Sequence, residues 1–269
     1  MTIAHLSDLH FGRIAHDAIV DVLVDDVNAA NVDLVVVSGD LTQRARPEEF
    51  DAATAMLARF TAPTLVVPGN HDVYPWWRPV ARIRRPLGRY RQCVTDNTRP
   101  QFTENGVAVF GVNSAHGLTV KGGRINGPAL QAMQDYFTAQ TASTFKVLVL
   151  HHHLTKLKAL GRHDIARRAQ HALDVATSVG VDLILCGHLH ISHIEPVEII
   201  PDEQRVVIAS AGTATSNRGR RTNRYTNFYN RIAIGAEGFT VKEYRYRPSE
   251  ERFRLDSSTR FSHNLAVDA

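Results

Sequence analysis

The stretch that decides the fold of this chain is LVVVSGD, from Leu34 to Asp40, in which an apolar run ends at a glycine and a carboxylate follows. A short run of β-branched residues that stops at glycine is typical of a buried strand that enters a tight loop. Three other apolar runs end in the same manner, at loops rich in carboxylate, amide and imidazole groups. They are Ser7-Asp8-Leu9-His10, Pro68-Gly69-Asn70-His71-Asp72 and Cys186-Gly187-His188-Leu189-His190. The sequence therefore predicts that four strand ends surround one site.

Length and composition favour one large α/β domain, because the chain has 269 residues of which 43% are hydrophobic. The sequence has no uninterrupted apolar run of membrane-spanning length and opens directly on a predicted strand, so we expect neither a membrane span nor a secretory signal, and a cytoplasmic location is the default. The two cysteines, Cys93 and Cys186, provide neither a disulfide framework nor metal-ligand spacing. A formal net charge of +4 indicates an anionic partner or substrate.

Strand and helix patterns alternate through the first two thirds of the chain, which predicts a parallel sheet with helical crossovers. The predicted strands are 3–6, 34–38, 64–67, 107–112, 146–150 and 183–185, and the predicted helices are 17–30, 47–60, 128–139 and 163–179. Four later runs lack intervening helices and predict antiparallel sheet. They are 197–200, 205–209, 229–234 and 239–246. Strand edges near Val206 and Tyr244 leave pairing in a homodimer open, and the polar tail from Pro248 is expected to pack loosely or to wrap the surface.

An insert rich in arginine and tryptophan, residues 73–101, interrupts the alternation. Six arginines lie between Arg78 and Arg91, interleaved with aromatic and aliphatic residues. We expect a cap over the site entrance, because the insert starts from one of the four loops; a solvated basic helix is the other interpretation. Trp76 and Trp77 are compatible with stacking on a base, contact with a bilayer surface, or anchoring of the insert, of which anchoring is favoured.

Taken together, five short motifs resemble the calcineurin-like metallophosphoesterase superfamily, and most closely its bacterial class III cyclic nucleotide phosphodiesterases. In this chain the motifs are Asp8-Leu9-His10, Gly39-Asp40, Gly69-Asn70-His71-Asp72, His151-His152-His153 and Gly187-His188-Leu189-His190. The resemblance implies an α/β fold of two packed mixed β-sheets flanked by helices, a four-layer sandwich. It also implies a single domain over 1–247 that includes the cap-like insert at 73–101, followed by a C-terminal tail at 248–269.

The same resemblance implies a role for each motif residue. Asp8, His10 and His190 would hold one metal ion, Asn70, His151 and His188 a second, and Asp40 would bridge the two through its oxygens. His151 is preferred to His152 because it is the first residue beyond its strand. His71 would stabilise the transition state or protonate the leaving oxygen, and Asp72 would orient His71 or shape its loop.

Imidazole and carboxylate ligands suit two divalent or mixed-valence metal ions of the Mn, Fe or Zn class. The implied function is a binuclear metal-dependent phosphohydrolase, in the first place a phosphodiesterase in which a metal-bridging hydroxide attacks phosphorus. A pyrophosphatase that acts on a nucleotide-sugar or lipid-linked pyrophosphate is the first alternative. A catalytically inactive interaction scaffold of the same fold is the second.

Charge narrows the substrate class. Two dications would contribute about +4, and Asp8, Asp40 and a hydroxide would subtract three, which leaves about +1 for the phosphate to neutralise. A substrate with further charge would need arginines. Arg84, Arg85 and Arg220 are the predicted substrate-binding residues, and Arg218, Arg221 and Arg224 are further candidates. The expected partner is a small anionic phosphodiester or pyrophosphate; the chain has no dedicated nucleic-acid module, and peripheral membrane contact stays open.

Overall fold

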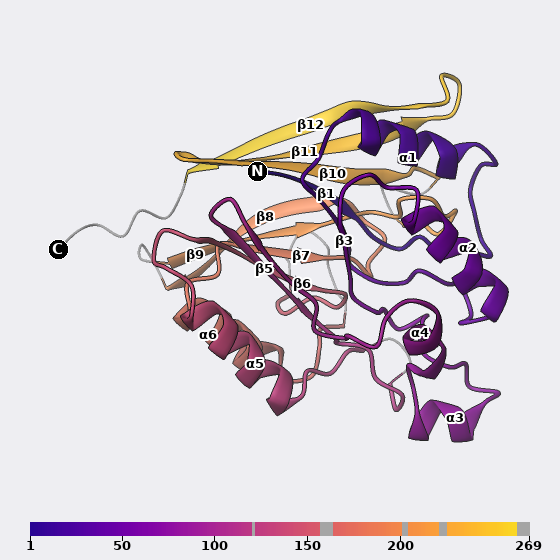
Figure 1. Ribbon diagram of the computed structural model, residues 1–269, viewed down its shortest axis with the longest axis horizontal. Helices are drawn as coiled ribbons and strands as arrows, with labels where there is room; N and C mark the ends of the chain where they lie inside the picture. The colour runs from indigo at the N-terminus through magenta and orange to yellow at the C-terminus, as the bar shows by residue number, and fades with distance from the viewer. Residues whose placement is uncertain (120–121, 157–163, 201–203, 221–224, 263–269) are drawn as a thin grey trace.

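Two six-stranded β-sheets pack face to face and are covered on their outer sides by helices (Figure 1). The computed structural model describes residues 1–119, 122–156, 164–200, 204–220 and 225–262. Both sheets contain parallel and antiparallel neighbours, so the predicted α/β class with two mixed sheets is confirmed.

The first sheet has the order β12-β11-β10-β1-β2-β3, in which the neighbouring pairs β1–β2 and β2–β3 are parallel and the other neighbouring pairs are antiparallel. Its strands are β1 (Thr2–Leu6), β2 (Leu34–Val37), β3 (Thr64–Val66), β10 (Phe228–Gly235), β11 (Gly238–Arg247) and β12 (Arg252–Ser262). The second sheet has the order β4-β5-β6-β7-β9-β8, with β5, β6, β7 and β9 parallel. Its strands are β4 (Gln101–Glu104), β5 (Val107–Val112), β6 (Phe145–Leu150), β7 (Leu183–Cys186), β8 (His193–Ile200) and β9 (Gln204–Ser210).

Helices cover the outer face of each sheet. In Figure 1, α1 and α2 lie beside the first sheet, α5 and α6 lie beside the second, and the short α3 and α4 lie together at one end. The helices are α1 (Ile19–Ala29), α2 (Pro47–Leu57), α3 (Pro79–Arg84), α4 (Gly88–Cys93), α5 (Gly127–Thr138) and α6 (Ala169–Ser178). None of the helices in the described part of the chain combines the length and the apolar character needed to span a bilayer.

The stretch from Leu34 to Val37 is apolar at every position because its strand is buried on both faces. In β2, Leu34 and Val36 pack into the core between the two sheets, whereas Val35 and Val37 pack against the helices on the outer face. In β6, Val147 and Val149 take the inner positions in the same way. Since successive side chains of a strand point to opposite faces, a strand buried on both faces must be apolar at every position.

The parallel strands bring their carboxyl ends to a common edge. In the first sheet β1 leads to Asp8, β2 to Asp40 and β3 to Asn70. In the second sheet β6 leads to His151 and β7 to His188. Ligand sites of α/β sheets form beyond these ends because no strand continues there to fill the space.

The structure confirms one expectation about the last third of the chain and corrects two. The four runs predicted as antiparallel strands pair antiparallel, β8 with β9 in the second sheet and β10 with β11 in the first. Val206 and Tyr244 lie on strands with neighbours on both sides, so neither provides a free edge for a homodimer. Of the two expectations for the tail from Pro248, loose packing is wrong for 252–262, which pair with β11 as the edge strand β12. We therefore propose that the domain predicted to end at 247 extends to Ser262.

Candidate metal centre

The loops that follow the strands hold their polar residues in an unusual backbone conformation. Five of the seven predicted ligand residues have positive φ angles, a conformation that is uncommon for residues other than glycine. They are Asp8 (52°), His10 (47°), Asp40 (55°), His188 (70°) and His190 (57°). Such strain persists only where surrounding contacts enforce it, and it gathers at functional sites.

Two motif glycines let these loops approach one another closely. A Cβ atom on Gly69 would lie 2.1 Å from Asp40 Oδ1, and one on Gly187 would lie 1.8 Å from Ser7 Oγ. The Gly-Asn-His-Asp and Gly-His-Leu-His motifs therefore begin with glycine because a side chain would occupy the space of a neighbouring ligand loop.

Asp8 and Asp40 each use one oxygen within the protein and leave the other unpaired. Asp8 Oδ2 accepts hydrogen bonds from Ser7 Oγ (2.7 Å) and the His188 main-chain N–H (2.9 Å), and Asp40 Oδ1 accepts one from the His71 main-chain N–H (2.8 Å). Asp8 Oδ1 and Asp40 Oδ2 are buried without a hydrogen-bond partner. An unpaired buried carboxylate oxygen is costly, which indicates that a cation belongs beside each of them.

Three histidines are oriented so that their Nε2 atoms face these oxygens. Each donates its Nδ1 hydrogen to a main-chain carbonyl, which leaves the Nε2 lone pair available as a ligand. The pairs are His10 with Thr42 (3.2 Å), His190 with Arg218 (2.8 Å) and His151 with Ser38 (2.8 Å).

The first group of ligand atoms joins Asp8, His10, Asp40 and His190, all of them buried. His190 Nε2 lies 3.1 Å from Asp8 Oδ1 and 3.2 Å from His10 Nε2. Two imidazole lone pairs at this distance repel each other unless a cation or a proton lies between them. Nitrogen and carboxylate oxygen are donors that first-row divalent metals accept, so these residues fit a metal ion.

The second group gathers around the Asn70 side chain. Asn70 Oδ1 lies 2.9 Å from His188 Nδ1 and 3.2 Å from His151 Nε2, and His151 Nε2 lies 3.3 Å from Asp40 Oδ2. His152 also has a ring nitrogen in this neighbourhood; its Nδ1 is paired with Ser114 Oγ at 2.8 Å, and its Nε2 is buried without a hydrogen-bond partner. The Nε2 of His151 lies close to both Asn70 Oδ1 and Asp40 Oδ2, and His151 stays the predicted ligand.

Asp40 Oδ2 lies close to both groups. It is 3.6 Å from His10 Nε2 in the first group and 3.3 Å from His151 Nε2 in the second. Asp40 Oδ1 accepts the hydrogen bond from the His71 main-chain N–H, and Oδ2 is the Asp40 oxygen that has no hydrogen-bond partner. A bridge through the oxygens of Asp40 stays a prediction.

Electrostatics at the site keep the carboxylates charged. Burial raises the pKa of Asp8, but the neighbouring His190 and His10 outweigh this effect and hold the pKa well below its usual range. At Asp40, His151 and His71 outweigh burial in the same way, and its pKa also lies well below the usual range. Burial lowers the pKa of His10 to about 4, and a neutral imidazole is the form that binds a metal. Burial also opposes charge on His151, yet Asp40 raises its pKa to about 9, so a proton on His151 competes with a metal ion.

His71 lies beside the two groups and is held at both ring nitrogens. Its Nδ1 donates to the Gln43 carbonyl (2.7 Å), and its Nε2 accepts from Arg218 Nη1 (3.1 Å), which also donates to Gln43 Oε1 (3.0 Å). Burial and the Arg218 cation lower the pKa of His71 despite the opposing effect of Asp40. His71 is therefore neutral in this arrangement, and Arg218 is its closest cationic neighbour among the described residues.

Asp72 does not contact the His71 ring. Its carboxylate accepts hydrogen bonds from the main-chain N–H groups of Leu41 (3.2 Å), Thr42 (2.9 Å) and Gly69 (2.9 Å) and from Thr42 Oγ1 (2.9 Å). Burial and the nearby Asp40 carboxylate raise the pKa of Asp72 to about 7, although these donors lower it. Of the two roles predicted for Asp72, these hydrogen bonds support shaping of the loops.

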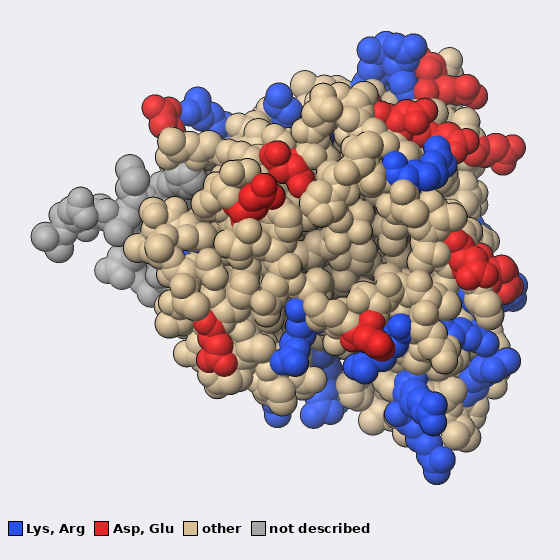
Figure 2. Space-filling view, in the orientation of Figure 1, with Lys and Arg blue, Asp and Glu red and all other residues tan. Residues whose placement is uncertain are grey.

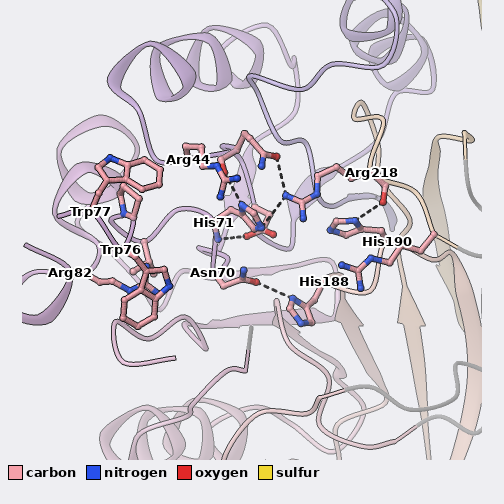
Figure 3. Close-up of a pocket in the computed structure, with 14 residues that line it drawn as sticks. Arg44, Asn70, His71, Trp76, Trp77, Arg82, His188, His190 and Arg218 are labelled. Carbon is pink, nitrogen blue, oxygen red and sulfur yellow. Dashed lines mark hydrogen bonds between the residues drawn. The ribbon is translucent and has the colours of Figure 1, made fainter. Parts of the chain in front are cut away.

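A cavity of about 250 Å³ opens over these residues (Figure 3). Trp76 and Trp77 stand on one side of the pocket, and His188, His190 and Arg218 stand on the other. The lining consists of Asp40, Gln43, Arg44, Asn70, His71, Val73, Pro75, Trp76, Trp77, Arg82, His188, His190, Arg218 and Arg220.

Only some of the arginines that line the pocket were predicted to bind substrate. Arg220 lines the pocket as expected, but Arg84 and Arg85 are exposed and do not line it, which corrects their assignment. Arg82 faces inward in their place, because its guanidinium donates to the Tyr74 carbonyl and to the Thr119 carbonyl (2.6 Å). The candidates Arg221 and Arg224 lie outside the described residues.

Two lining residues were missed from the sequence, Gln43 and Arg44. They follow Asp40 by three and four positions, so their place in a ligand loop was the available signal. Arg44 is exposed and its guanidinium carbon lies 6.0 Å from the centre of the Trp77 ring. Neither belongs to one of the five motifs, and polar residues in loops carry no distinctive pattern by themselves.

Comparison with known proteins agrees with the family that the five motifs resemble. Residues 1–192 match the family model described as calcineurin-like phosphoesterase. The glycerophosphodiester phosphodiesterase GpdQ of Enterobacter lignolyticus is 39% identical over 85 residues, which cover 27% of this chain and 30% of the relative. The 3',5'-cyclic adenosine monophosphate phosphodiesterase CpdA of Haemophilus influenzae is 24% identical over 169 residues, or 59% of this chain and 54% of the relative. The chain thus spans about half or less of these relatives.

Solved structures share the fold at low sequence identity. A purple acid phosphatase from yellow lupin superimposes with a TM-score of 0.68 at 12% identity, covering 97% of this chain and 53% of that one. A dimetal phosphatase from Danio rerio gives a TM-score of 0.65 at 13% identity, covering 97% and 98%. These likenesses establish the fold alone.

Proposed function

Because the chain belongs to the calcineurin-like phosphoesterase family, we propose that it is a binuclear metal-dependent phosphodiesterase. One observation carries this proposal. Asp8 Oδ1 and Asp40 Oδ2 are buried without partners, and imidazole nitrogens from loops of both sheets converge on them. Burial of unpaired carboxylate oxygens costs free energy, and a cation bound beside them would offset that cost.

The residues that would hold the two ions follow from the two groups of ligand atoms. Asp8, His10 and His190 would hold one ion, Asn70, His151 and His188 the other, and Asp40 Oδ2 would lie between them. When bound, divalent cations of the Mn, Fe or Zn class would lower the pKa of water and stabilise negative charge on phosphoryl oxygens.

The protein groups at the pocket would bind and orient the phosphate. Arg218 Nη1 can turn from His71 Nε2 to an anionic oxygen of the substrate, and charge-assisted hydrogen bonds of this kind are the stronger ones. With Arg218 turned away, His71 Nε2 would be free to take up a proton from water and to give it to the leaving oxygen, while its Nδ1 hydrogen stays on the Gln43 carbonyl.

A second candidate, hydrolysis of a pyrophosphate bond, is favoured by the arginines at the pocket. Arg44 and Arg220 line it in addition to Arg218, so a substrate with more negative charge than a simple diester would find partners. Trp76 and Trp77 give the same pocket an apolar wall. A nucleotide-sugar or lipid-linked pyrophosphate combines these two properties.

The decisive experiment measures metal content and turnover on the same preparation. Protein stripped with a chelator and reloaded with Mn²⁺ should bind two ions per chain and hydrolyse bis(p-nitrophenyl) phosphate. A substrate panel of 3',5'-cyclic nucleotides, glycerophosphodiesters, nucleotide-sugar pyrophosphates and phosphomonoesters would then rank the candidates by kcat/KM. We expect diesters to exceed monoesters.

A pair of matched variants tests whether the site performs the reaction. His71→Ala should lower kcat by about 100-fold or more, since positioned acid–base groups contribute that much. His193→Ala is the control, because His193 is paired with Glu195 (3.0 Å) and does not line the pocket. Absence of bound metal together with no turnover on the whole panel would instead favour the catalytically inactive scaffold.

A further inference from the structure

The surface of the insert exposes large apolar side chains. Of the seven large hydrophobic side chains that the described residues expose, four lie between residues 76 and 83. They are Trp76 (51% exposed), Trp77 (62%), Val80 (65%) and Ile83 (63%). Monomeric proteins rarely group such residues on their surface unless the group contacts a partner or a membrane.

Helix α3 is oriented opposite to an ordinary surface helix. Its arginine Arg82 is buried, whereas Val80 and Ile83 point to solvent. Arg82 is fixed by the carbonyls of Tyr74 and Thr119, and its guanidinium carbon lies 4.2 Å from the centre of the Trp76 ring. Since these contacts hold Arg82 inward, the apolar side chains cannot turn into the protein.

The same surface is strongly basic. Arg78, Arg84 and Arg85 are exposed around the apolar group, and residues 73–95 contain no Asp or Glu. Within the part of the chain that the structure describes, no carboxylate forms an ion pair with these three arginines. Figure 2 shows Lys and Arg side chains gathered at the lower right, where Figure 1 places α3 and α4.

We propose that this surface, formed by Trp76, Trp77, Val80 and Ile83 with Arg78, Arg84 and Arg85, docks the protein on an anionic lipid bilayer. Aromatic and aliphatic tips enter the boundary between headgroups and acyl chains, and arginines pair with lipid phosphates. A second copy of the chain fits this surface poorly, because a two-fold contact would bring its arginines against themselves without a carboxylate. A nucleic acid would leave Val80 and Ile83 without a role.

Docking would also place the pocket at the headgroup layer. Trp76 and Trp77 line the pocket and belong to the docking surface, so the pocket and the bilayer would share this wall. Binding to the bilayer does not depend on the proposed hydrolysis, and it can be measured without turnover.

The two tryptophans of the surface make the test direct, because they are the only tryptophans in the chain. We expect their fluorescence emission to shift to the blue with phosphatidylcholine vesicles that contain about a third phosphatidylglycerol, and less with phosphatidylcholine alone. Co-sedimentation with the vesicles should weaken as salt is raised.

Matched variants distinguish vesicle binding by this surface from effects that substitutions have anywhere on the protein. Arg84→Gln with Arg85→Gln should weaken partitioning by about 25-fold, at about fivefold for each arginine near an anionic membrane. Ile83→Ser should weaken it by about tenfold. The control substitutions lie on β12: Arg252→Gln with Arg254→Gln, and Leu255→Ser, which removes a side chain that is 52% exposed. Circular dichroism melting checks that every variant is folded.

Each of four outcomes would overturn the proposal. The first is that no vesicle produces a blue shift or sediments the protein, and the second is that the insert variants and the control variants lose vesicle binding equally. The third is a blue shift that appears without vesicles and depends on protein concentration. The fourth is displacement of the protein from vesicles by an oligonucleotide that itself shifts the emission. The third would identify a second copy as the occupant, and the fourth a nucleic acid.

Discussion

Replacement of Asp40 by Asn should abolish both metal sites at once. Asp40 Oδ2 lies within 3.6 Å of a ligand nitrogen from each group, His10 Nε2 and His151 Nε2. Asn70 Oδ1, in contrast, is hydrogen-bonded to His151 and His188, both of the second group. The structure therefore predicts a graded series in which the wild type binds two ions, Asn70→Ala one and Asp40→Asn none.

The magnitude follows from the coupling between binding and folding. A ligand present at 100 times its Kd stabilises the folded state by about 2.7 kcal/mol, so two independent sites add about 5 kcal/mol. For a chain of this length each kcal/mol shifts Tm by about 2 °C. Saturating Mn²⁺ should then raise Tm by about 11 °C in the wild type, about 5 °C in Asn70→Ala and less than about 2 °C in Asp40→Asn.

The assay is thermal unfolding in a chelator and in Mn²⁺, with metal content measured on the same samples. Asp33→Asn is the matched control, because Asp33 accepts a hydrogen bond from the Thr2 main chain far from the ligands (2.6 Å). It should keep the full shift of the wild type. Two bound ions and an undiminished shift in Asp40→Asn would refute the reasoning, and equal losses in Asp40→Asn and Asn70→Ala would refute the bridge.

Three further predictions follow from single contacts. Gly187→Ala would place a Cβ atom 1.8 Å from Ser7 Oγ, so urea unfolding should show a loss of about 1–3 kcal/mol and Mn²⁺ titration a weaker affinity. Burial lowers the pKa of His5 to about 3, below its unfolded value of 6.5, so its contribution to stability is complete above pH 6.5 and is lost as pH falls toward 3. In the metal-free protein, the unfolding free energy falls between pH 7 and pH 4, and His5→Gln should make this fall smaller by about 3 kcal/mol. An equal fall in the wild type and in His5→Gln would contradict this. Arg218→Ala should lower kcat/KM on a soluble diester by about 10- to 100-fold, because a charge-assisted hydrogen bond is lost, whereas the exposed Arg252→Ala should change it little.

The sequence by itself determined the buried strands and the residues that could bind metal. Apolar runs such as Leu34–Val37 predict buried strands because a strand enclosed on both faces must be apolar at each position, which is a local property of the chain. The order of the five motifs then led to the family and to the seven candidate ligands. All seven lie within hydrogen-bond or ion-pair distance of another member of the set.

The tertiary structure decided the features that depend on contacts between distant segments. The position of the His71 main chain selects Asp40 Oδ2 as the oxygen without a hydrogen-bond partner, and the Tyr74 and Thr119 carbonyls explain why Arg82 turns inward while Arg84 faces solvent. In the same way, the polar residues of β12 pair with β11 although their own sequence has no strong alternation. Partners that lie tens of residues away leave no trace in a local pattern, so orientation and pairing could be read only from the folded chain.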